Sequence, residues 1–238
     1  METSLKAAPF ILGIETSGKT GGLALFQEKL LYEINFLAKE SYSKTFFQFL
    51  PPLFEVANVS FEDIQVIAVD IGPGSFTGLR IGLSAIKALS LVYQYPLLPL
   101  SSLEILAYNF WGVDLPILSL VDAYTKEAFL ALYKFEGENL RTLLPPQLLK
   151  LEEVKGLINE PTLFVSESLE KWENYFAKEI KTNFIKPPIR PILRASLLCE
   201  IAWLKIKKGE AEFITGAELL PLYLKPSEAE RQKCLSSS

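Results

Sequence analysis

The sequence has no histidine among its 238 residues. Because histidine is the commonest general base and the commonest zinc ligand, its absence excludes a Ser-His-Asp triad, a Cys-His dyad and an H-x-x-x-H metal site. Cysteine is nearly as scarce, and Cys199 and Cys234 support neither a disulfide framework nor a metal cluster. We therefore expect no metal and no cofactor, and a reducing, cytoplasmic environment.

Long apolar runs and an excess of positive charge are also missing. No stretch reaches the roughly 18 apolar residues of a membrane span, and the first residues lack the basic flank and apolar core of a secretory signal. We expect a soluble protein with no membrane partner. The formal net charge is −4, whereas a chain that neutralises many phosphates by itself carries a positive excess, so unaided binding to nucleic acid is disfavoured.

What the sequence does contain is material for a core, since 49% of its residues are hydrophobic, 12% are aromatic and only 22% are charged. This composition predicts a globular fold, and the length suggests two modest lobes. Pro96, Pro99 and the pair Ser101-Ser102 interrupt the chain strongly. We place the boundary there, with one lobe over residues 1–100 and the other over residues 101–238, including a frayed tail.

Apolar periodicity predicts the same kind of unit in both halves. In the first half we expect strands at residues 10–15, 21–26, 30–36 and 65–71, a helix at residues 43–57 that Pro51 and Pro52 kink or interrupt, and a helix at residues 77–93. In the second half we expect strands at residues 117–121, 128–135 and 162–165 and helices at residues 103–110, 169–178 and 194–208. The predicted fold class is α/β, with two tandem lobes whose mixed sheets are flanked by helices.

The loop of residues 72–80, GPGSFTGLR, lies between a predicted strand and a predicted helix. Free backbone N–H groups at such a position can hold a phosphate. The loop is not a Walker A sequence, which needs Lys-Ser/Thr, and it is not G-x-G-x-x-G, because Thr77 takes the place of the third glycine. A tight turn with a helix cap also explains these glycines and serines, and we favour that interpretation.

Small residues recur on the helix that follows, at Gly78, Gly82, Ala85 and Ala88. Each glycine inside a helix costs about 1 kcal/mol relative to alanine, so a face this bare indicates close packing against another backbone. The partner is either a helix of the same chain or another subunit. The predicted helix at residues 43–57 carries an aromatic stripe, which offers a second broad surface for an interface.

Three acidic residues, Glu15, Asp70 and Asp122, lie at or near the ends of predicted strands, where open α/β sheets place their ligands. Such carboxylates bind Mg²⁺ if they converge in space. Strand-end acids also cap turns and helices, and we favour this capping role.

Five segments share their order and spacing with one known family. They are ILGIETS at residues 11–17, GPGSFTGLRIGLSAIKAL at residues 72–89, LPLSSLEILA at residues 98–107, Asp122-Ala123-Tyr124, and PLYLKP at residues 221–226. On these segments, which run along nearly the whole chain, the sequence resembles the TsaB family, also called YeaZ, and the GPGSFTGLRIG block is its most specific signature. The resemblance implies an actin-like (ASKHA) fold of two lobes.

The same resemblance implies a function. Members of the family are non-catalytic partners of TsaD, which transfers a threonylcarbamoyl group to the adenosine next to the tRNA anticodon, and the ATPase TsaE joins the complex. It therefore implies an assembly subunit that is not itself an enzyme, binds TsaD, supports TsaE, meets tRNA only within the complex, and forms homodimers through the surface that binds TsaD. The partner-binding residues it implies are Phe46, Phe47, Leu50, Phe54, Ser75, Thr77, Gly78, Arg80, Ile81, Gly82, Ala85 and Leu89.

The sequence departs from the family pattern at three places. The His-Ser pair of many members near residues 42–45 is absent, Asp-Ala-Arg becomes Asp122-Ala123-Tyr124, and Tyr-Leu-Arg becomes Tyr223-Leu224-Lys225, so bidentate arginine contacts are weakened there. The alternative function is that of an actin-like nucleotide-binding ATPase or small-molecule kinase. It would use Glu15, Thr16, Ser17 and Asp122 around Mg²⁺, but Asp122-Ala123-Tyr124 lacks the glycine of the phosphate-binding turn in such ATPases, which disfavours hydrolysis.

Overall fold

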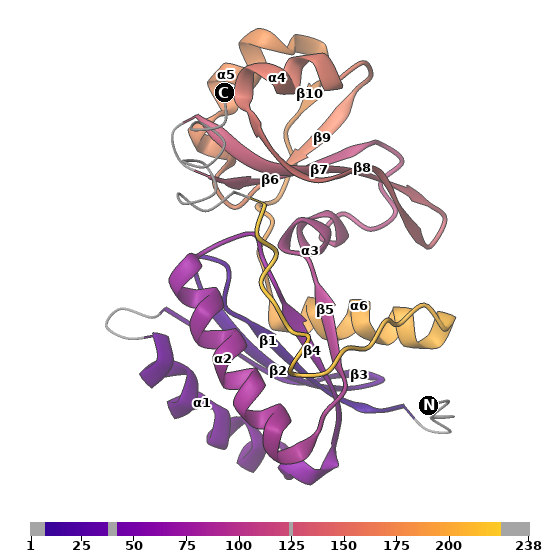
Figure 1. Cartoon of the computed structure of the whole chain (residues 1–238). Helices are drawn as coiled ribbons and strands as arrows, with labels where there is room; N and C mark the ends of the chain where they lie inside the picture. Colours follow the sequence, from indigo (N-terminus) through magenta and orange to yellow (C-terminus); the bar gives the residue numbers. More distant parts are fainter. Residues whose placement is uncertain (1–7, 38–41, 124–125, 225–238) are drawn as a thin grey trace, which may run out of the picture.

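Two mixed five-stranded sheets form the frame of the two lobes (Figure 1). The computed structural model describes residues 8–37, 42–123 and 126–224. The first sheet contains β1 (Phe10–Glu15), β2 (Gly21–Gln27), β3 (Lys29–Phe36), β4 (Ile64–Asp70) and β5 (Leu97–Leu100), and the second contains β6 (Ile117–Asp122), β7 (Glu127–Glu136), β8 (Asn139–Lys150), β9 (Thr162–Val165) and β10 (Phe184–Ile185). The α-helices are α1 (Tyr42–Ala57), α2 (Phe76–Tyr93), α3 (Ser102–Tyr108), α4 (Leu151–Val154), α5 (Glu173–Glu179) and α6 (Ala195–Lys208).

The two lobes repeat one order of elements. The first sheet has the strand order β3-β2-β1-β4-β5, and the second has the matching order β8-β7-β6-β9-β10. In each sheet three antiparallel strands come first, and two strands that follow helices are then added in parallel. The predicted class of two tandem α/β lobes with mixed sheets is therefore confirmed, and the matching strand orders extend the similarity of the two halves that the apolar periodicity predicted.

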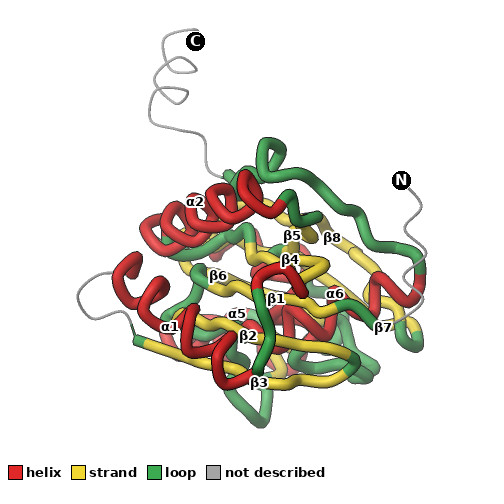
Figure 2. Tube along the Cα trace, turned by 90° about the horizontal axis from the view of Figure 1, so that it is seen from below, coloured by secondary structure: helices red, strands yellow, loops and turns green. Residues whose placement is uncertain are grey.

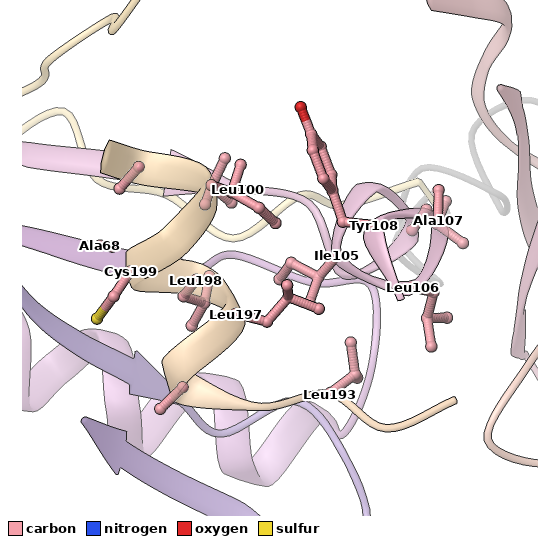
Figure 3. Packing of buried hydrophobic residues seen from close by; sticks show 14 of the residues in the cluster. Ala68, Leu100, Ile105, Leu106, Ala107, Tyr108, Leu193, Leu197, Leu198 and Cys199 are labelled. Carbon is pink, nitrogen blue, oxygen red and sulfur yellow. The ribbon is translucent and has the colours of Figure 1, made fainter. Parts of the chain in front are cut away.

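The last helix of each lobe packs on the sheet of the other lobe. Helix α3 follows β5 but contacts β6 and β7, whereas α6 follows β10 but contacts β1, β2, β3 and β4. The two helices meet between the sheets, where Leu197 and Leu198 of α6 lie beside Ile105 of α3 (Figure 3). A division of the chain at residue 100 separates the strands of the two sheets. It assigns α6 to the second lobe, however, although α6 packs on the sheet of the first.

Alternating side chains of the first sheet build two layers of core. Ile11, Ala24 and Ala68 belong to the layer shared with α6 and α3, whereas Leu12 and Ile67 belong to the layer under α1 and α2. Helices α1 and α2 lie side by side over that second layer (Figure 2). Among the described residues, α2 is the one helix long and apolar enough to cross a membrane, a test that the core helix of a soluble protein also passes.

Helix α1 continues through Pro51 and Pro52, so the predicted interruption is wrong. Each proline lacks the N–H that would bond to the carbonyl one turn earlier. Both prolines are exposed, as are Phe47 and Gln48 one turn before them. The carbonyl groups left without a helical donor therefore lie on the solvent side, where water can bond to them.

Three strands were not predicted, namely β5, β8 and the two-residue β10, and proline occurs in the first two. Strand β5 contains Pro99, and β8 contains Pro145 and Pro146. Both are edge strands of their sheets, where a missing N–H costs no ladder bond on the outer side. The helix predicted at residues 169–178 is in fact a short 3₁₀ turn (Leu169–Lys171) followed by α5.

After α6 the chain returns along the first lobe as an extended strap, residues 211–224. Ile214 exchanges two backbone hydrogen bonds with Leu97 of β5, at 2.8 and 2.9 Å. Further on, Leu219 is fully buried, and the N–H of Leu222 donates to the carbonyl of Ile71 at 2.8 Å. The strap therefore covers the β5 edge of the first sheet and ends near the start of α2.

Candidate functional site

The loop between β4 and α2 starts the helix with a serine cap. The N–H of Gly78 donates to Ser75 Oγ, and the N–H of Ser75 donates to the carbonyl of Ser17 at 2.8 Å. The N–H of Gly72 donates to Asp70 Oδ1 at 2.7 Å. Because these N–H groups already donate to partners inside the chain, they are not free to bind a phosphate. The geometry agrees with the turn-and-cap interpretation.

The bare face of α2 packs against the turn that follows β1. A Cβ atom on Gly78 would lie 2.0 Å from the carbonyl oxygen of Thr16, and one on Gly82 would lie 2.2 Å from Thr16 Oγ1. The close packing predicted from the glycine spacing is therefore present, but its partner is a turn of the same chain rather than a helix or another subunit. Gly78, Gly82 and Ala85 are buried and do not lie on a surface open to a partner, whereas Ala88, the fourth residue predicted for this face, is exposed.

The aromatic stripe of α1 also faces the interior. Phe46, Leu50 and Phe54 are at most 5% exposed and pack in the core under α1, whereas Phe47 on the opposite side is 52% exposed. An amphipathic stripe marks the side of a helix that packs on its own sheet. Of the α1 residues expected to bind a partner, Phe47 alone lies at the surface.

The outer side of α2 presents a row of exposed residues one turn apart: Phe76, Arg80, Ser84, Ala88 and Val92. We call these five the α2 row. The guanidinium of Arg80 lies over the ring of Phe76, 3.9 Å from its centroid. Of the five, sequence reasoning expected only Arg80 to bind a partner. It named Ala88 only as a small residue for close packing, and it missed Phe76, Ser84 and Val92, whose only signal is their spacing. Of the other residues expected to bind a partner, Ser75 and Thr77 are exposed, and Ile81 and Leu89 are half-buried.

At the ends of β1 and β4, four polar side chains form a buried network. Ser17 Oγ lies 3.0 Å from Glu15 Oε1, 2.5 Å from Asp70 Oδ2 and 3.0 Å from Ser102 Oγ. Ser102 Oγ in turn lies 2.7 Å from Asp70 Oδ1. All four residues are at most 4% exposed. Sequence reasoning missed Ser102, whose only signal is its place at the start of α3.

Burial raises the pKa of both acids in this network. The pKa of Glu15 lies well above its usual range, because burial and the neighbouring Asp70 both disfavour its charge. Burial raises the pKa of Asp70 to about 6, although hydrogen bonds from Ser17, Gly72 and Ser102 lower it. Since Ser17 has one hydroxyl proton for three oxygen neighbours, a proton retained by the acid pair completes the network.

Asp122 stands apart from the buried network. Its carboxylate pairs with Lys171, and both residues line a cleft of about 450 Å³ between the lobes. Ser17 also lines this cleft, whereas Glu15 is fully buried and Thr16 packs on α2. The four residues expected around a nucleotide therefore do not form one site. Among the residues that the structure describes, no group of three acidic or cysteine side chains is placed to hold a metal ion.

A second hollow, of about 320 Å³, opens at the N-terminal end of the α2 row. It lies between α2, the end of β6 and the strap, and its lining includes Phe76, Arg80, Asp122, Phe129 and Tyr223. The hollow therefore continues the exposed surface of α2. The substituted positions Tyr124 and Lys225, and the side chains of Tyr42 and Ser43, lie outside the part of the chain that the structure describes.

The family model described as tRNA N6-adenosine threonylcarbamoyltransferase (TsaD) matches residues 36–201. Two solved structures from Pseudomonas aeruginosa share the fold. One, described as an uncharacterized protein with similarity to peptidase YeaZ, has a TM-score of 0.77 at 21% identity, and the other, YeaZ, has a TM-score of 0.70 at 22% identity. Each match covers 91% of this chain and 100% of the other. Together with the matching strand orders of the two lobes, these findings define the class as two-lobed actin-like (ASKHA-type) proteins.

Within that class, the sequence relatives narrow the assignment. The tRNA threonylcarbamoyladenosine biosynthesis protein TsaB of Bacillus subtilis (strain 168) is 31% identical over 225 residues, which cover 92% of this chain and 96% of that protein. TsaB of Escherichia coli (strain K12) is 25% identical over 156 residues, 61% of this chain and 68% of that protein. The chain belongs to the TsaB (YeaZ) family.

Proposed function

We propose that this protein is a non-catalytic assembly subunit in the biosynthesis of threonylcarbamoyladenosine in tRNA. It binds a TsaD-type partner in the cytoplasm, supports TsaE, and meets tRNA only within the complex. The match to TsaB over 92% of the chain carries the proposal. The separation of Glu15 and Thr16 from the cleft supports a non-catalytic role, because the residues expected around a nucleotide do not converge.

The partner-binding surface is the α2 row together with the exposed side of α1. Ser84 and Ala88, at the middle of the row, have short side chains that let another helix approach closely. The neighbouring Leu91 is 84% exposed and Val92 is 73% exposed, so the C-terminal end of the row offers apolar area. Desolvated apolar side chains at the centre of an interface supply most of its binding energy.

The α2 row of one copy can pair with the α2 row of a second copy that runs in the opposite direction. In an antiparallel pair of α2 helices centred on Ser84, Arg80 faces Ala88 of the second copy, and Phe76 faces Val92 of the second copy. Phe76 and Val92 are about 24 Å apart along the helix axis at 1.5 Å per residue. A homodimer with two-fold symmetry therefore places an apolar end against the hollow beside Phe76 twice.

A TsaD-type partner can use the same surface. The TsaD family model matches residues 36–201, a range that includes α1 and α2, so a TsaD-type protein has counterparts of both helices. In the heterodimer, the partner's counterparts of α1 and α2 then take the place that α1 and α2 of the second copy have in the homodimer. Homodimer and heterodimer formation should compete, because both bury the α2 row.

The test uses two exposed alanines on helices of different lobes. Ala88→Arg places a long charged side chain in the middle of the α2 row, whereas Ala177→Arg makes the same change on α5. We expect Ala88→Arg to weaken binding to TsaD from the same source at least about tenfold and to shift any homodimer toward monomer. The Ala177→Arg variant should behave as the unmodified chain. Light scattering during size exclusion gives the masses, and calorimetry gives the affinity.

Unchanged TsaD binding by Ala88→Arg would remove the α2 row as the contact. If the unmodified chain fails to bind TsaD even with TsaE and ATP present, the assembly role itself is wrong. Calorimetry with ATP and Mg²⁺ on the isolated chain tests the alternative, since micromolar binding would support a nucleotide-dependent enzyme.

A further inference from the structure

One side chain, Glu167 in the loop after β9, accepts hydrogen bonds from two separate segments. Its Oε2 accepts from the N–H of Lys19, in the turn between β1 and β2, at 3.3 Å. Its Oε1 accepts from the N–H of Leu193, in the segment that leads into α6, at 3.3 Å. Glu167 belongs to the second lobe, whereas the β1–β2 turn and α6 pack in the first. Its carboxylate therefore bridges the two lobes.

Two cationic side chains converge on the same residue. Lys19 Nζ donates to the carbonyl of Glu167 at 2.9 Å, and Arg190 Nη2 donates to that carbonyl at 2.6 Å. The fit at the carboxylate is close, because a Cβ atom on Gly18 would lie 3.2 Å from Glu167 Oε2. Lys19, Leu193 and Glu167 all line the 450 Å³ cleft. Arg190 borders the neighbouring hollow instead. Two backbone N–H donors at one wall of a cleft, with a lysine ammonium beside them, are the groups that bind a small oxyanion.

The position of Glu167 differs from that of its acidic neighbour Glu170. Glu170 Oε1 lies 3.6 Å from Lys19 Nζ and 3.4 Å from Arg190 Nη2, so it faces the same two cations. Its side chain is 60% exposed, and it borders a different hollow from the cleft. Glu170 neutralises the cations from outside, whereas Glu167 receives the N–H groups that face the cleft. Both residues place a negative charge near the same two cations, but only the Glu167 carboxylate accepts the two N–H groups. Comparing the two residues therefore distinguishes an effect of net charge from an effect of the site.

We propose that the carboxylate of Glu167 occupies a built-in oxyanion site of the interlobe cleft, formed by the N–H groups of Lys19 and Leu193 with the Lys19 ammonium held nearby on the Glu167 carbonyl, and thereby closes the lobes on each other. A small oxyanion such as phosphate binds there when this carboxylate is removed. In the unmodified chain the Glu167 carboxylate itself fills this site, so an anion from solution does not bind there. The proposal does not depend on the assembly role, because every group in it belongs to this chain.

The charge of Glu167 also acts on the first lobe. It is one of the groups that raise the pKa of Asp70 in the buried network, although burial is the larger cause. A phosphate bound in its place would keep a negative charge at that position.

The experiment removes the carboxylate from the full chain and supplies an anion in solution. We expect Glu167→Ala to have a lower melting temperature than the unmodified chain, and phosphate or acetate to restore it in a concentration-dependent way. Calorimetry should show phosphate binding to Glu167→Ala at least tenfold tighter than to the unmodified chain. Adding Lys19→Met to Glu167→Ala should abolish the gain.

The matched control is Glu170→Ala, which removes the same charge beside the same two cations. An equal gain in phosphate binding by Glu170→Ala would overturn the proposal, because net charge alone would then explain it. A folded Glu167→Ala variant that binds phosphate no better than the unmodified chain would also overturn it. If Glu167→Ala folds only with phosphate or acetate present, the proposal is supported. If it never folds, Glu167→Ser takes its place, because serine also empties the site, and a folded Glu167→Ser variant that binds phosphate no better than the unmodified chain would overturn the proposal.

Discussion

Glu15 and Asp122 occupy the same place in the two lobes, since each ends the central strand of its sheet, β1 or β6, before the turn to an antiparallel neighbour. Glu15 is fully buried, and its pKa is raised by burial, whereas Asp122 lines the cleft and pairs with Lys171. The neighbouring helix makes the difference. Helix α2 presses its glycines onto the turn after β1, but the 3₁₀ turn before α5 brings a lysine to Asp122. What packs on a strand end therefore decides what its carboxylate does.

The strongest way to break this contrast is to block the close approach of α2. Gly78→Ala puts a Cβ atom where only 2.0 Å separates it from the Thr16 carbonyl. Overpacking of this kind costs about 1–3 kcal/mol or more, which outweighs the roughly 1 kcal/mol that alanine adds to a helix. Because the contact is with a backbone oxygen, which cannot move aside cheaply, we expect a loss of at least about 3 kcal/mol in urea unfolding. Gly156→Ala is the matched control, because nothing lies within 4 Å of its Cβ position, and it should change stability by less than about 1 kcal/mol.

The next prediction concerns pH and the buried acids. The folded pKa of Asp70 is about 6, above the ordinary value of 3.8, so its stabilising contribution is full below about pH 4 and is lost as the pH rises through 6. Asp70→Asn mimics the protonated acid. We expect the stability of the unmodified chain, measured relative to Asp70→Asn, to fall by about 2–3 kcal/mol between pH 4 and pH 7.

An exposed acid gives the opposite sign and serves as the control. Hydrogen bonds from Ser60 lower the pKa of Asp63, so its contribution is present above its ordinary pKa and is lost in acid. Urea unfolding of Asp63→Asn in a series extended below pH 4 should therefore show a difference from the unmodified chain that grows, rather than falls, with rising pH. A flat difference for Asp70→Asn would show that Asp70 is ionised in the folded chain throughout this range.

The smallest effect is expected at Asp122. Its partner Lys171 has a side chain that is 50% exposed, and ion pairs of this kind contribute less than about 1 kcal/mol. Asp122→Asn should shift the urea midpoint only slightly, and any shift should shrink at high salt. A loss comparable with that of Gly78→Ala would mean that the two strand-end acids are equally important to the fold, and the contrast between the lobes would fail.

The fold was predictable where apolar periodicity alone decides it. The periodic segments became strands and helices close to their predicted bounds, because alternating or three- and four-residue spacing marks the buried side. Strands β5 and β8 were missed because proline is a breaker only where its N–H would be needed. The exchange of α3 and α6 has no local signal, since an apolar helix face does not say which sheet will cover it.

The sequence identified the two helices, α1 and α2, that carry the candidate surface, but it did not identify which side of each helix is exposed. The glycines of α2 and the aromatics of α1 gave the strongest patterns, and those patterns report packing within the chain. The α2 row combines Phe76, Arg80, Ser84, Ala88 and Val92, a mixture whose members are exposed. Only knowledge of which side of α2 meets the β1–β2 turn separates this row from the buried side.

The exchange of α3 and α6 also fixes an order of events on the ribosome. The strands of the first sheet are complete once Leu100 has been made, yet the sheet face that contains Ile11, Ala24 and Ala68 is covered by α6, which ends at Lys208. That apolar face stays open while the whole second sheet is synthesised. The lobe that begins first is therefore the lobe that is finished last, and the nascent chain must be kept from aggregating during that interval.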